Sequence, residues 1–264
     1  MTELAGGKLR LEEPADGVAR LVIDNPERRG ALDHDILDAI ASVTGSLDAR
    51  CLVVTGSGSV FSAGYDLGNL EEGTFEQSAS ELVAHPFHEA IGALEAYAFP
   101  VIAEINGHAI GGGLELALSC DIRVAAQGVK LGMPPARLGL IYSHTGLRKF
   151  IDVCGPANTS ELFFTARNVD AARGQRMGLV NEVVAPERLA SHVLEMATAI
   201  AANAPLSLSG NKRIMRTLRE YEGALPDDVE RELIELRESC FASEDFREGV
   251  RAFGEKRSPR WEGR

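Results

Sequence analysis

The chain has 264 residues, of which 45% are hydrophobic and 25% charged, as in an ordinary globular protein. Its formal net charge of −12 argues against nucleic-acid partners and against docking on an anionic membrane surface. No run of about 18 apolar residues is present that could span a membrane, and the first residues lack the apolar centre of a signal peptide. The four cysteines fit no metal or disulfide spacing. We therefore expect a cytoplasmic protein with reduced thiols and without a bound metal.

The first part of the chain predicts two strands, a helix and a third strand. Lys8–Glu12 and Val18–Asp24 are strand-like and are separated by Pro14-Ala15-Asp16-Gly17, which is typical of a hairpin turn. Asp33 is placed to cap a helix whose apolar residues recur at helical spacing. Cys51–Thr55 then predicts a short buried strand. A strand–helix–strand order of this kind favours an α/β fold.

Two glycine-containing turns follow predicted buried strands. The first is FSAGYDL at residues 61–67. The second lies in EINGHAIGGGLELALSCD at residues 104–121, where three consecutive glycines open a short helix that is apolar on nearly all sides. Backbone N–H groups in the first turn of a helix suit an oxygen that carries negative charge. Two such turns can each direct one N–H group at a single oxygen and so form an oxyanion hole.

Glu115 lies in the first turn of the helix that the glycines open. It is the only ionisable side chain between His108 and Asp121. On this stretch alone, Glu115 is either a carboxylate that favours the helix dipole in a close-packed turn or a catalytic group.

The second half of the chain predicts further strands and helices and ends in helices alone. The predicted elements are a strand at Asp121–Ala126, a helix that starts at Gly155-Pro156, a helix capped by Asp170, a strand at Leu179–Val184, and helices at Pro186–Ala201 and Pro205–Tyr221. Each of the last two helices has a proline in its first turn, where a missing N–H costs little.

The chain resembles the crotonase (enoyl-CoA hydratase/isomerase) family in FSAGYDL at 61–67, HAIGGGLELALSCDIRVA at 108–125 and EGVRAFGEKR at 248–257. The resemblance implies an α/β fold in which residues 1–200 form a spiral of ββα units that holds the coenzyme A site and the oxyanion hole. It implies that residues 201–264 form a C-terminal helical region, which covers the coenzyme A site and assembles a homotrimer or a dimer of trimers.

The same resemblance implies an acyl-CoA substrate and no cofactor beyond the coenzyme A moiety of that substrate. The thioester carbonyl would accept hydrogen bonds from the backbone N–H groups of Tyr65 and Gly112. The backbone around Ala63, Asp66 and Leu67 would face the adenine.

Three further residues are candidates for the rest of the coenzyme. By resemblance, Phe253 and Lys256 would approach its phosphates or adenosine, from the same or a neighbouring subunit. Arg28, after Asn25-Pro26, is a candidate for a phosphate contact. Lys256 and Arg28 are also compatible with solvated surface charges.

The loop after the central helix departs from the family's hydratases, which hold a water between two glutamates. Glu115 matches the first glutamate, but the second position is taken by Pro135, which cannot accept a proton. The spacing of Leu138, Gly139 and Tyr142, together with ELFFTARNVDA at 161–171, instead resembles the family's methylmalonyl-CoA decarboxylases.

Decarboxylation of a malonyl-type thioester leaves an enolate directly, so it needs an oxyanion hole but no strong base. We therefore expect an acyl-CoA lyase of this kind, with Glu115 and Tyr142 beside the oxyanion hole. Tyr142 would hold the departing carboxylate or deliver a proton, and it also suits a pocket wall. Tyr65 departs from the decarboxylase pattern, in which a histidine is expected. An enoyl-CoA hydratase that uses Glu115 alone and a non-catalytic acyl-CoA-binding protein remain as alternatives.

Overall fold

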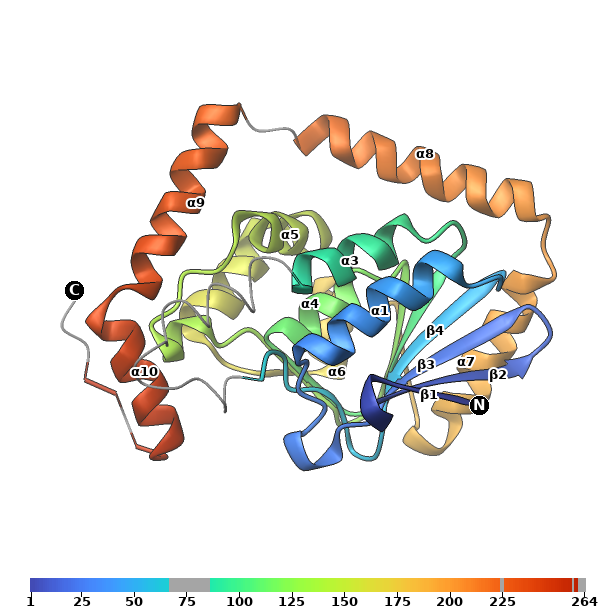
Figure 1. Ribbon diagram of the computed structural model, residues 1–264, viewed down its shortest axis with the longest axis horizontal. Helices are drawn as coiled ribbons and strands as arrows, with labels where there is room; N and C mark the ends of the chain where they lie inside the picture. Colours follow the sequence, from blue (N-terminus) through green and yellow to red (C-terminus); the bar gives the residue numbers. More distant parts are fainter. Residues whose placement is uncertain (67–85, 224–225, 258, 261–264) are drawn as a thin grey trace.

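In the computed structural model, the chain has a mixed α/β fold (Figure 1). The structure describes residues 1–66, 86–223, 226–257 and 259–260. Leu67, one of the candidate coenzyme-binding residues, lies outside these ranges.

The larger sheet of the described residues has seven strands in the order β1-β2-β3-β4-β6-β8-β11. Their bounds are β1 Thr2–Leu4, β2 Leu9–Ala15, β3 Val18–Ile23, β4 Cys51–Gly56, β6 Val101–Ile105, β8 Ile122–Ala126 and β11 Glu182–Val184. The first three strands pair antiparallel, and from β3 to β11 the pairing is parallel. The parallel strands are almost fully apolar because both faces of the sheet are covered.

A smaller sheet has the order β10-β9-β7-β5. Its strands are β5 Val60–Ser62, β7 His108–Ile110, β9 Lys130–Gly132 and β10 Val169–Asp170. Along the chain, β4, β6 and β8 of the larger sheet are each followed by a strand of the smaller one, and a helix comes after each pair. The chain therefore winds as a spiral of ββα units, as the sequence resemblance implied.

Helices cover the two sheets and then continue beyond them. Their bounds are α1 His34–Ser46, α3 Pro86–Ala96, α4 Gly112–Leu118, α5 His144–Thr165, α6 Ala171–Met177, α7 Pro186–Ala201, α8 Pro205–Gly223, α9 Asp227–Phe241 and α10 Glu244–Gly254, with 3₁₀ turns at η1 Ala5–Gly7, η2 Pro26–Arg28 and η4 Pro135–Leu138. α1 packs on α3, and α7 packs on strands of the larger sheet. No helix in the described part of the chain combines the length and apolarity needed to cross a bilayer.

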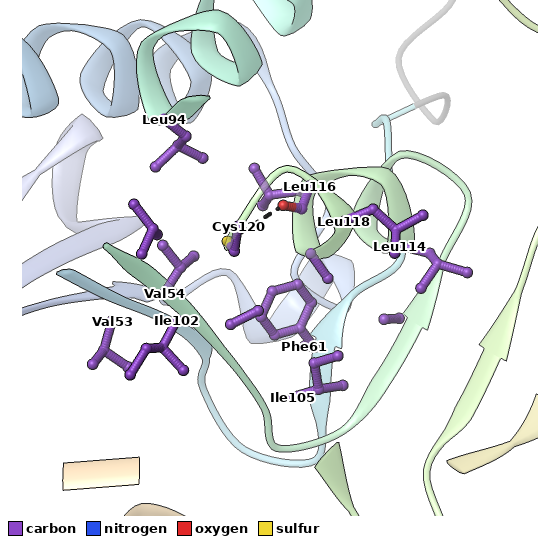
Figure 2. Packing of buried hydrophobic residues seen from close by; sticks show 14 of the residues in the cluster. Val53, Val54, Phe61, Leu94, Ile102, Ile105, Leu114, Leu116, Leu118 and Cys120 are labelled. Atoms are coloured by element: carbon purple, nitrogen blue, oxygen red, sulfur yellow. Dashed lines mark hydrogen bonds between the residues drawn. The ribbon is translucent and has the colours of Figure 1, made fainter. Parts of the chain in front are cut away.

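The core lies between the larger sheet and the central helix α4. Figure 2 shows the ring of Phe61 among Ile102 and Ile105 of β6 and leucines of α4. Phe61, Ile102 and Leu116 are all fully buried. Because every residue of α4 is buried, this packing fixes its position in the centre of the spiral.

The C-terminal helices extend from this core along its outside (Figure 1). α8 is anchored by Lys212, whose Nζ lies 2.7 Å from Asp121 Oδ2 and donates to the carbonyl of Phe99 at 2.9 Å. α10 packs on η4, where Gly249 approaches the backbone of Leu138.

Several local predictions are confirmed. β2 and β3 form the expected antiparallel pair. The Asp33 side chain accepts a hydrogen bond from the Ile36 N–H at 3.0 Å and so caps α1. Asp170 caps α6 in the same way. The bounds of α7 are the predicted Pro186–Ala201.

Helix α5 differs from the prediction. It begins at His144, where the Ser143 side chain accepts from the Gly146 N–H, and not at Gly155-Pro156. Gly155 has φ +75° and ψ 162°, so it breaks α5 into two helical segments. The proline thus marks the start of the second segment, since its ring suits the first turn of a helix. The strand expected at Leu179–Val184 is also shorter in the structure, where β11 covers Glu182–Val184.

Replacing Phe61 by alanine tests whether this residue holds the core together. We expect Phe61→Ala to lower the free energy of unfolding by about 3–5 kcal/mol, because the cavity left behind cannot collapse fully. Phe164→Ala is the matched control, since the Phe164 side chain is 81% exposed and should cost under about 0.5 kcal/mol. Urea denaturation followed by circular dichroism measures both. Equal losses in the two variants would contradict the assignment of Phe61 to the core.

Candidate active site

The candidate site is built where the loop after β5 meets the first turn of α4. A methyl group added at Gly113 would lie 2.3 Å from the carbonyl oxygen of Ser62, so only glycine permits this approach. A methyl group on Gly64 would lie 2.8 Å from the Gly112 nitrogen, and Gly64 has φ +89°. The glycines of both turns thus let two backbones come into direct contact.

The backbone at Tyr65 is oriented by a bridge to Leu32. The Leu32 N–H donates to the Gly64 carbonyl at 2.7 Å, and the Asp66 N–H donates to the Leu32 carbonyl at 3.1 Å. Because successive N–H groups of an extended chain point to opposite sides, the Tyr65 N–H points away from Leu32.

The start of α4 supplies a second backbone donor. Gly111 has φ +58° and ψ −127°, a conformation open mainly to glycine, and it turns the chain from β7 into the helix. Gly112 is the first residue of α4, where an N–H has no acceptor within the helix. The structure therefore brings the backbone of Tyr65 close to that of Gly112. Their geometry suits two donors to one oxygen.

Glu115 projects from α4 and is buried, with 5% of its surface exposed. Its Oε2 accepts a hydrogen bond from the Tyr142 hydroxyl. Burial raises the pKa of Glu115 above its ordinary value, while the Lys149 ammonium and the Tyr142 hydroxyl offset part of that rise. The carboxyl group can thus take up or release a proton nearer to neutral pH than an exposed glutamate does.

Tyr142 lies in the segment between η4 and α5 and is also buried. Its ring packs edge-on against Phe163, with 5.5 Å between the ring centroids. Burial, the negative charge of Glu115 and the neighbouring Tyr65 raise the pKa of Tyr142 well above its ordinary value. The hydroxyl therefore stays protonated at neutral pH and remains a hydrogen-bond donor.

The side chain of Tyr65 joins this pair. A side-chain hydrogen bond between Tyr65 and Tyr142 is one of the contributions to the raised pKa of Tyr142. The Tyr65 ring packs edge-on against Phe87 at 4.7 Å, and it lies over the α carbon of Gly112. Tyr65, Tyr142 and Glu115 thus form a line of hydrogen-bonding groups beside the two backbone donors.

The position that the resemblance assigns to a second glutamate is occupied by Pro135 at the start of η4. Pro135 is buried in the interior of the molecule. It offers neither an acid nor a hydrogen-bond donor.

The candidate coenzyme-binding residues fall into two groups. Ala63 is exposed beside Asp66, and Arg28 Nη1 lies 3.8 Å from Asp66 Oδ1. Phe253 is 68% exposed on α10, and Lys256 follows the end of that helix on the surface. The described contacts bring Arg28 to the loop of Ala63 and Asp66, but they do not join Phe253 and Lys256 to it.

Three polar residues behind Glu115 were missed by sequence reasoning. Lys149 on α5 lies 2.7 Å from Glu95 Oε1 on α3, and its Nζ donates to Ser119 Oγ at 2.6 Å. Nothing in the local sequence marks these residues, because each falls on a helix or helix end where a solvated polar side chain is common.

Known proteins match this chain over nearly its whole length. A family model described as enoyl-CoA hydratase/isomerase matches residues 13–264. A crotonyl-CoA hydratase of Syntrophomonas wolfei is 34% identical over 254 residues, which is 93% of this chain and 94% of that one. A crystal structure of methylmalonyl-CoA decarboxylase has a TM-score of 0.89 at 26% identity and covers 100% of both chains. A second structure of methylmalonyl-CoA decarboxylase, in complex with 2-nitronate-propionyl-CoA, has a TM-score of 0.88 at 27% identity, covering 97% of this chain and 99% of that one.

Replacing Gly113 by alanine tests the contact between the two turns. The added methyl group meets the Ser62 carbonyl at 2.3 Å, so we expect a loss of several kcal/mol in the free energy of unfolding, within the range for severe overpacking. Gly92→Ala in α3 is the matched control, because nothing lies within 4 Å of the added methyl group. That substitution should stabilise the helix by about 0.5–1 kcal/mol. A Gly113→Ala variant as stable as the parent would disprove the close approach.

Proposed function

Because the chain belongs to the enoyl-CoA hydratase/isomerase family, we propose that it is a lyase that acts on acyl-CoA thioesters through a stabilised enolate. The family that the motifs indicated is confirmed, and the fold agrees with that of crotonase-type relatives. Membership makes the protein an enzyme of the crotonase superfamily that acts on acyl-CoA. The particular reaction is the subject of the proposal.

In the proposal, the thioester oxygen lies between the N–H groups of Tyr65 and Gly112. The meeting of the two glycine turns supports this assignment. Negative charge develops on that oxygen when an enolate forms, so each donor acts mainly in the transition state. A donor of this kind is worth about 2.7–4 kcal/mol.

The reaction that we assign is decarboxylation of a malonyl-type thioester, such as methylmalonyl-CoA. The observation that carries it is the buried carboxyl group of Glu115, hydrogen-bonded to Tyr142, with Pro135 at the place that the resemblance assigns to a second glutamate. The bond between the α carbon and the carboxylate breaks, its electron pair passes into the thioester as an enolate, and carbon dioxide leaves. A site with one fewer carboxylate also repels the substrate's own carboxylate less.

The enolate must then take up one proton at its α carbon. A substrate carboxylate beside Glu115 raises the pKa of Glu115 further, so the complex binds a proton there. We assign to Tyr142 the transfer of that proton: its hydroxyl proton goes to the α carbon, and its oxygen receives the proton of Glu115. This returns Glu115 to its ionised form, and no cofactor beyond the coenzyme A of the substrate is involved.

Hydration of an enoyl-CoA is the second candidate, favoured by the names of the curated relatives. Besides the crotonyl-CoA hydratase, a short-chain-enoyl-CoA hydratase of Clostridium acetobutylicum is 32% identical over 249 residues, 91% of this chain and 92% of that one. In that reaction ionised Glu115 would accept a proton from the water that attacks the β carbon, and the same two N–H groups would hold the enolate oxygen. Glu115 would then give that proton to the α carbon, which returns Glu115 to its ionised form.

For the coenzyme, we propose contacts to the backbone of Ala63, Asp66 and Leu67. Arg28 is proposed to contact a phosphate, which fits its exposed position beside Asp66. Phe253 and Lys256 would contribute from α10, whose exposed Phe253 ring suits stacking on an adenine.

We further propose a homotrimer or a dimer of trimers in which residues 201–264 supply the contacts between subunits around the spiral core of residues 1–200. Support comes from large apolar side chains on α8 that are between 56% and 86% exposed, namely Leu206, Ile214, Met215 and Leu218. Such a concentration on one helix is typical of a protein–protein contact.

A parallel assay of purified protein against methylmalonyl-CoA and crotonyl-CoA tests the reaction. We expect propionyl-CoA from the first substrate and little 3-hydroxybutyryl-CoA from the second, both measured by mass spectrometry. In deuterated water the propionyl-CoA should carry one deuterium at the α carbon. Rapid hydration with no decarboxylation would reverse the order of the two candidates. Binding of both thioesters without turnover would indicate a catalytically silent acyl-CoA-binding protein.

Two substitutions separate the roles of the backbone and of Glu115. Gly112→Pro removes one proposed oxyanion donor, so every thioester reaction should fall at least about 10²- to 10³-fold in kcat. Glu115→Gln should lower hydration by several orders of magnitude but decarboxylation only modestly, because carbon dioxide loss needs no base and the Tyr142 hydroxyl still carries a proton for the enolate, which water can then replace. Steady-state kinetics with both substrates measures these effects. Full turnover by Gly112→Pro, with its fold verified by circular dichroism, would rule out the proposed oxyanion hole.

A further inference from the structure

A partly buried cation lies at the end of the candidate catalytic helix. The Lys149 side chain is only 15% exposed, and its Nζ contacts Glu95 Oε1 at 2.7 Å and Ser119 Oγ at 2.6 Å. Ser119 is the C-cap of α4, and its hydroxyl donates to the Glu115 carbonyl at 2.8 Å. Lys149 therefore ties α5 and α3 to the turn that carries Glu115.

Ion pairing with Glu95 alone does not explain this burial. A lysine that only paired with a half-exposed glutamate would gain little from leaving water, and desolvation of its ammonium is costly. The Lys149 charge also acts on Glu115, since it opposes the rise that burial causes in the pKa of Glu115. By geometry, Lys149 contacts Ser119, which lies one helical turn after Glu115 on the same face of α4, and it pairs with Glu95.

Two further charged groups on the strands beside α4 have partners of their own. On β6, Glu104 pairs with Arg20 at 3.4 Å. On β7, exposed His108 accepts a hydrogen bond from the Lys130 N–H. The loop after β5 contributes Tyr65, and the segment before α5 contributes Tyr142, both as uncharged hydroxyls. Among the described residues, Lys149 is the cation whose charge lowers the pKa of Glu115.

We propose that Lys149 is a positioning residue that holds the Glu115 carboxylate in its charged form before substrate binds, with Glu95 setting how much of the lysine's charge reaches Glu115. The inference rests on the proposed role of Glu115 and identifies what prepares that group for its task. An ionised Glu115 accepts a hydrogen bond from the Tyr142 hydroxyl and keeps that hydroxyl fixed. It is also the form that can receive a proton, from water in hydration or on binding of an anionic substrate.

Removing the charge of Lys149 and removing the charge of Glu95 should shift the pKa of Glu115 in opposite directions. Lys149→Met removes the positive charge and leaves Glu95 unneutralised, so the pKa of Glu115 should rise by roughly one pH unit or more. Glu95→Gln removes a negative charge that raises the pKa of Glu115, so the pKa should fall. The double variant should lie between the two. A purely structural role for Lys149 predicts no such opposite signs.

The pKa of Glu115 can be measured without any substrate. Protein labelled with ¹³C at the glutamate δ carbon is titrated by NMR, and the Glu115 signal is the one absent from Glu115→Gln. Arg148→Met is the matched control, because Arg148 is adjacent to Lys149 on α5 but pairs with Asp152 at 2.8 Å on the surface. It should leave the Glu115 titration unchanged within about 0.2 pH unit, since exposed charges are well screened.

A titration that does not move in Lys149→Met and Glu95→Gln, or that moves the same way in both, would overturn the inference. If Lys149→Met fails to fold, Lys149→Gln is titrated in its place, because its amide can still donate a hydrogen bond towards Glu95 or Ser119 while the positive charge is removed. Because the readout needs no turnover, it stands whether or not the decarboxylase assignment holds. Where hydration activity is present, the acidic limb of its kcat/KM profile should move with the titration, about tenfold in rate for each pH unit, because hydration uses ionised Glu115 as the base.

Discussion

The approach of the Ser62 carbonyl to Gly113 is the constraint on which the site depends. It presses the first turn of α4 against the loop after β5, and no side chain larger than hydrogen fits between them. Both proposed oxygen donors are then backbone N–H groups held by two buried elements, so their positions do not depend on side-chain rotamers. Glu115 follows two residues later on the same helix, and its direction is fixed by the same contact. Preorganised donors of this kind need no rearrangement when charge develops.

The second constraint is electrostatic. Glu115 lies in an apolar helix at the centre of the spiral, where an isolated carboxylate would be unfavourable. The Tyr142 hydroxyl stabilises it from one side and the Lys149 ammonium from the other. Dry surroundings that make the charge costly also strengthen each hydrogen bond in the site. The Glu115 carboxylate thus has a hydrogen-bond donor and a positive charge to stabilise it within a core that the sequence pattern predicts to be apolar.

Features governed by neighbouring residues could be predicted from the sequence. The Asp33 cap, the bounds of α7 and the glycine turns depend on contacts within a few positions. The spiral and the placing of Glu115 and Tyr142 in one site required the family resemblance, and their hydrogen bond was not predicted, because no local pattern brings residues 27 positions apart together. Neither local patterns nor the resemblance predicted the role of Lys149, since it contacts Ser119 across 30 positions and is indistinguishable in sequence from other lysines on amphipathic helices. The first half of α5 was missed because Gly155-Pro156 resembled a helix start.

That break at Gly155 has a consequence for how the family can diversify. Lys149 lies before it and Phe163 after it, yet both act on the Tyr142–Glu115 pair, one by charge and one by ring packing. Since the two halves of α5 are oriented separately, substitutions in the second half can move the ring that supports Tyr142 without displacing the ammonium behind Glu115. The shape of the site around Tyr142 and the proton affinity of Glu115 can then change independently during evolution. A single unbroken helix would have coupled them, and a change of substrate would have disturbed the acid–base chemistry at the same time.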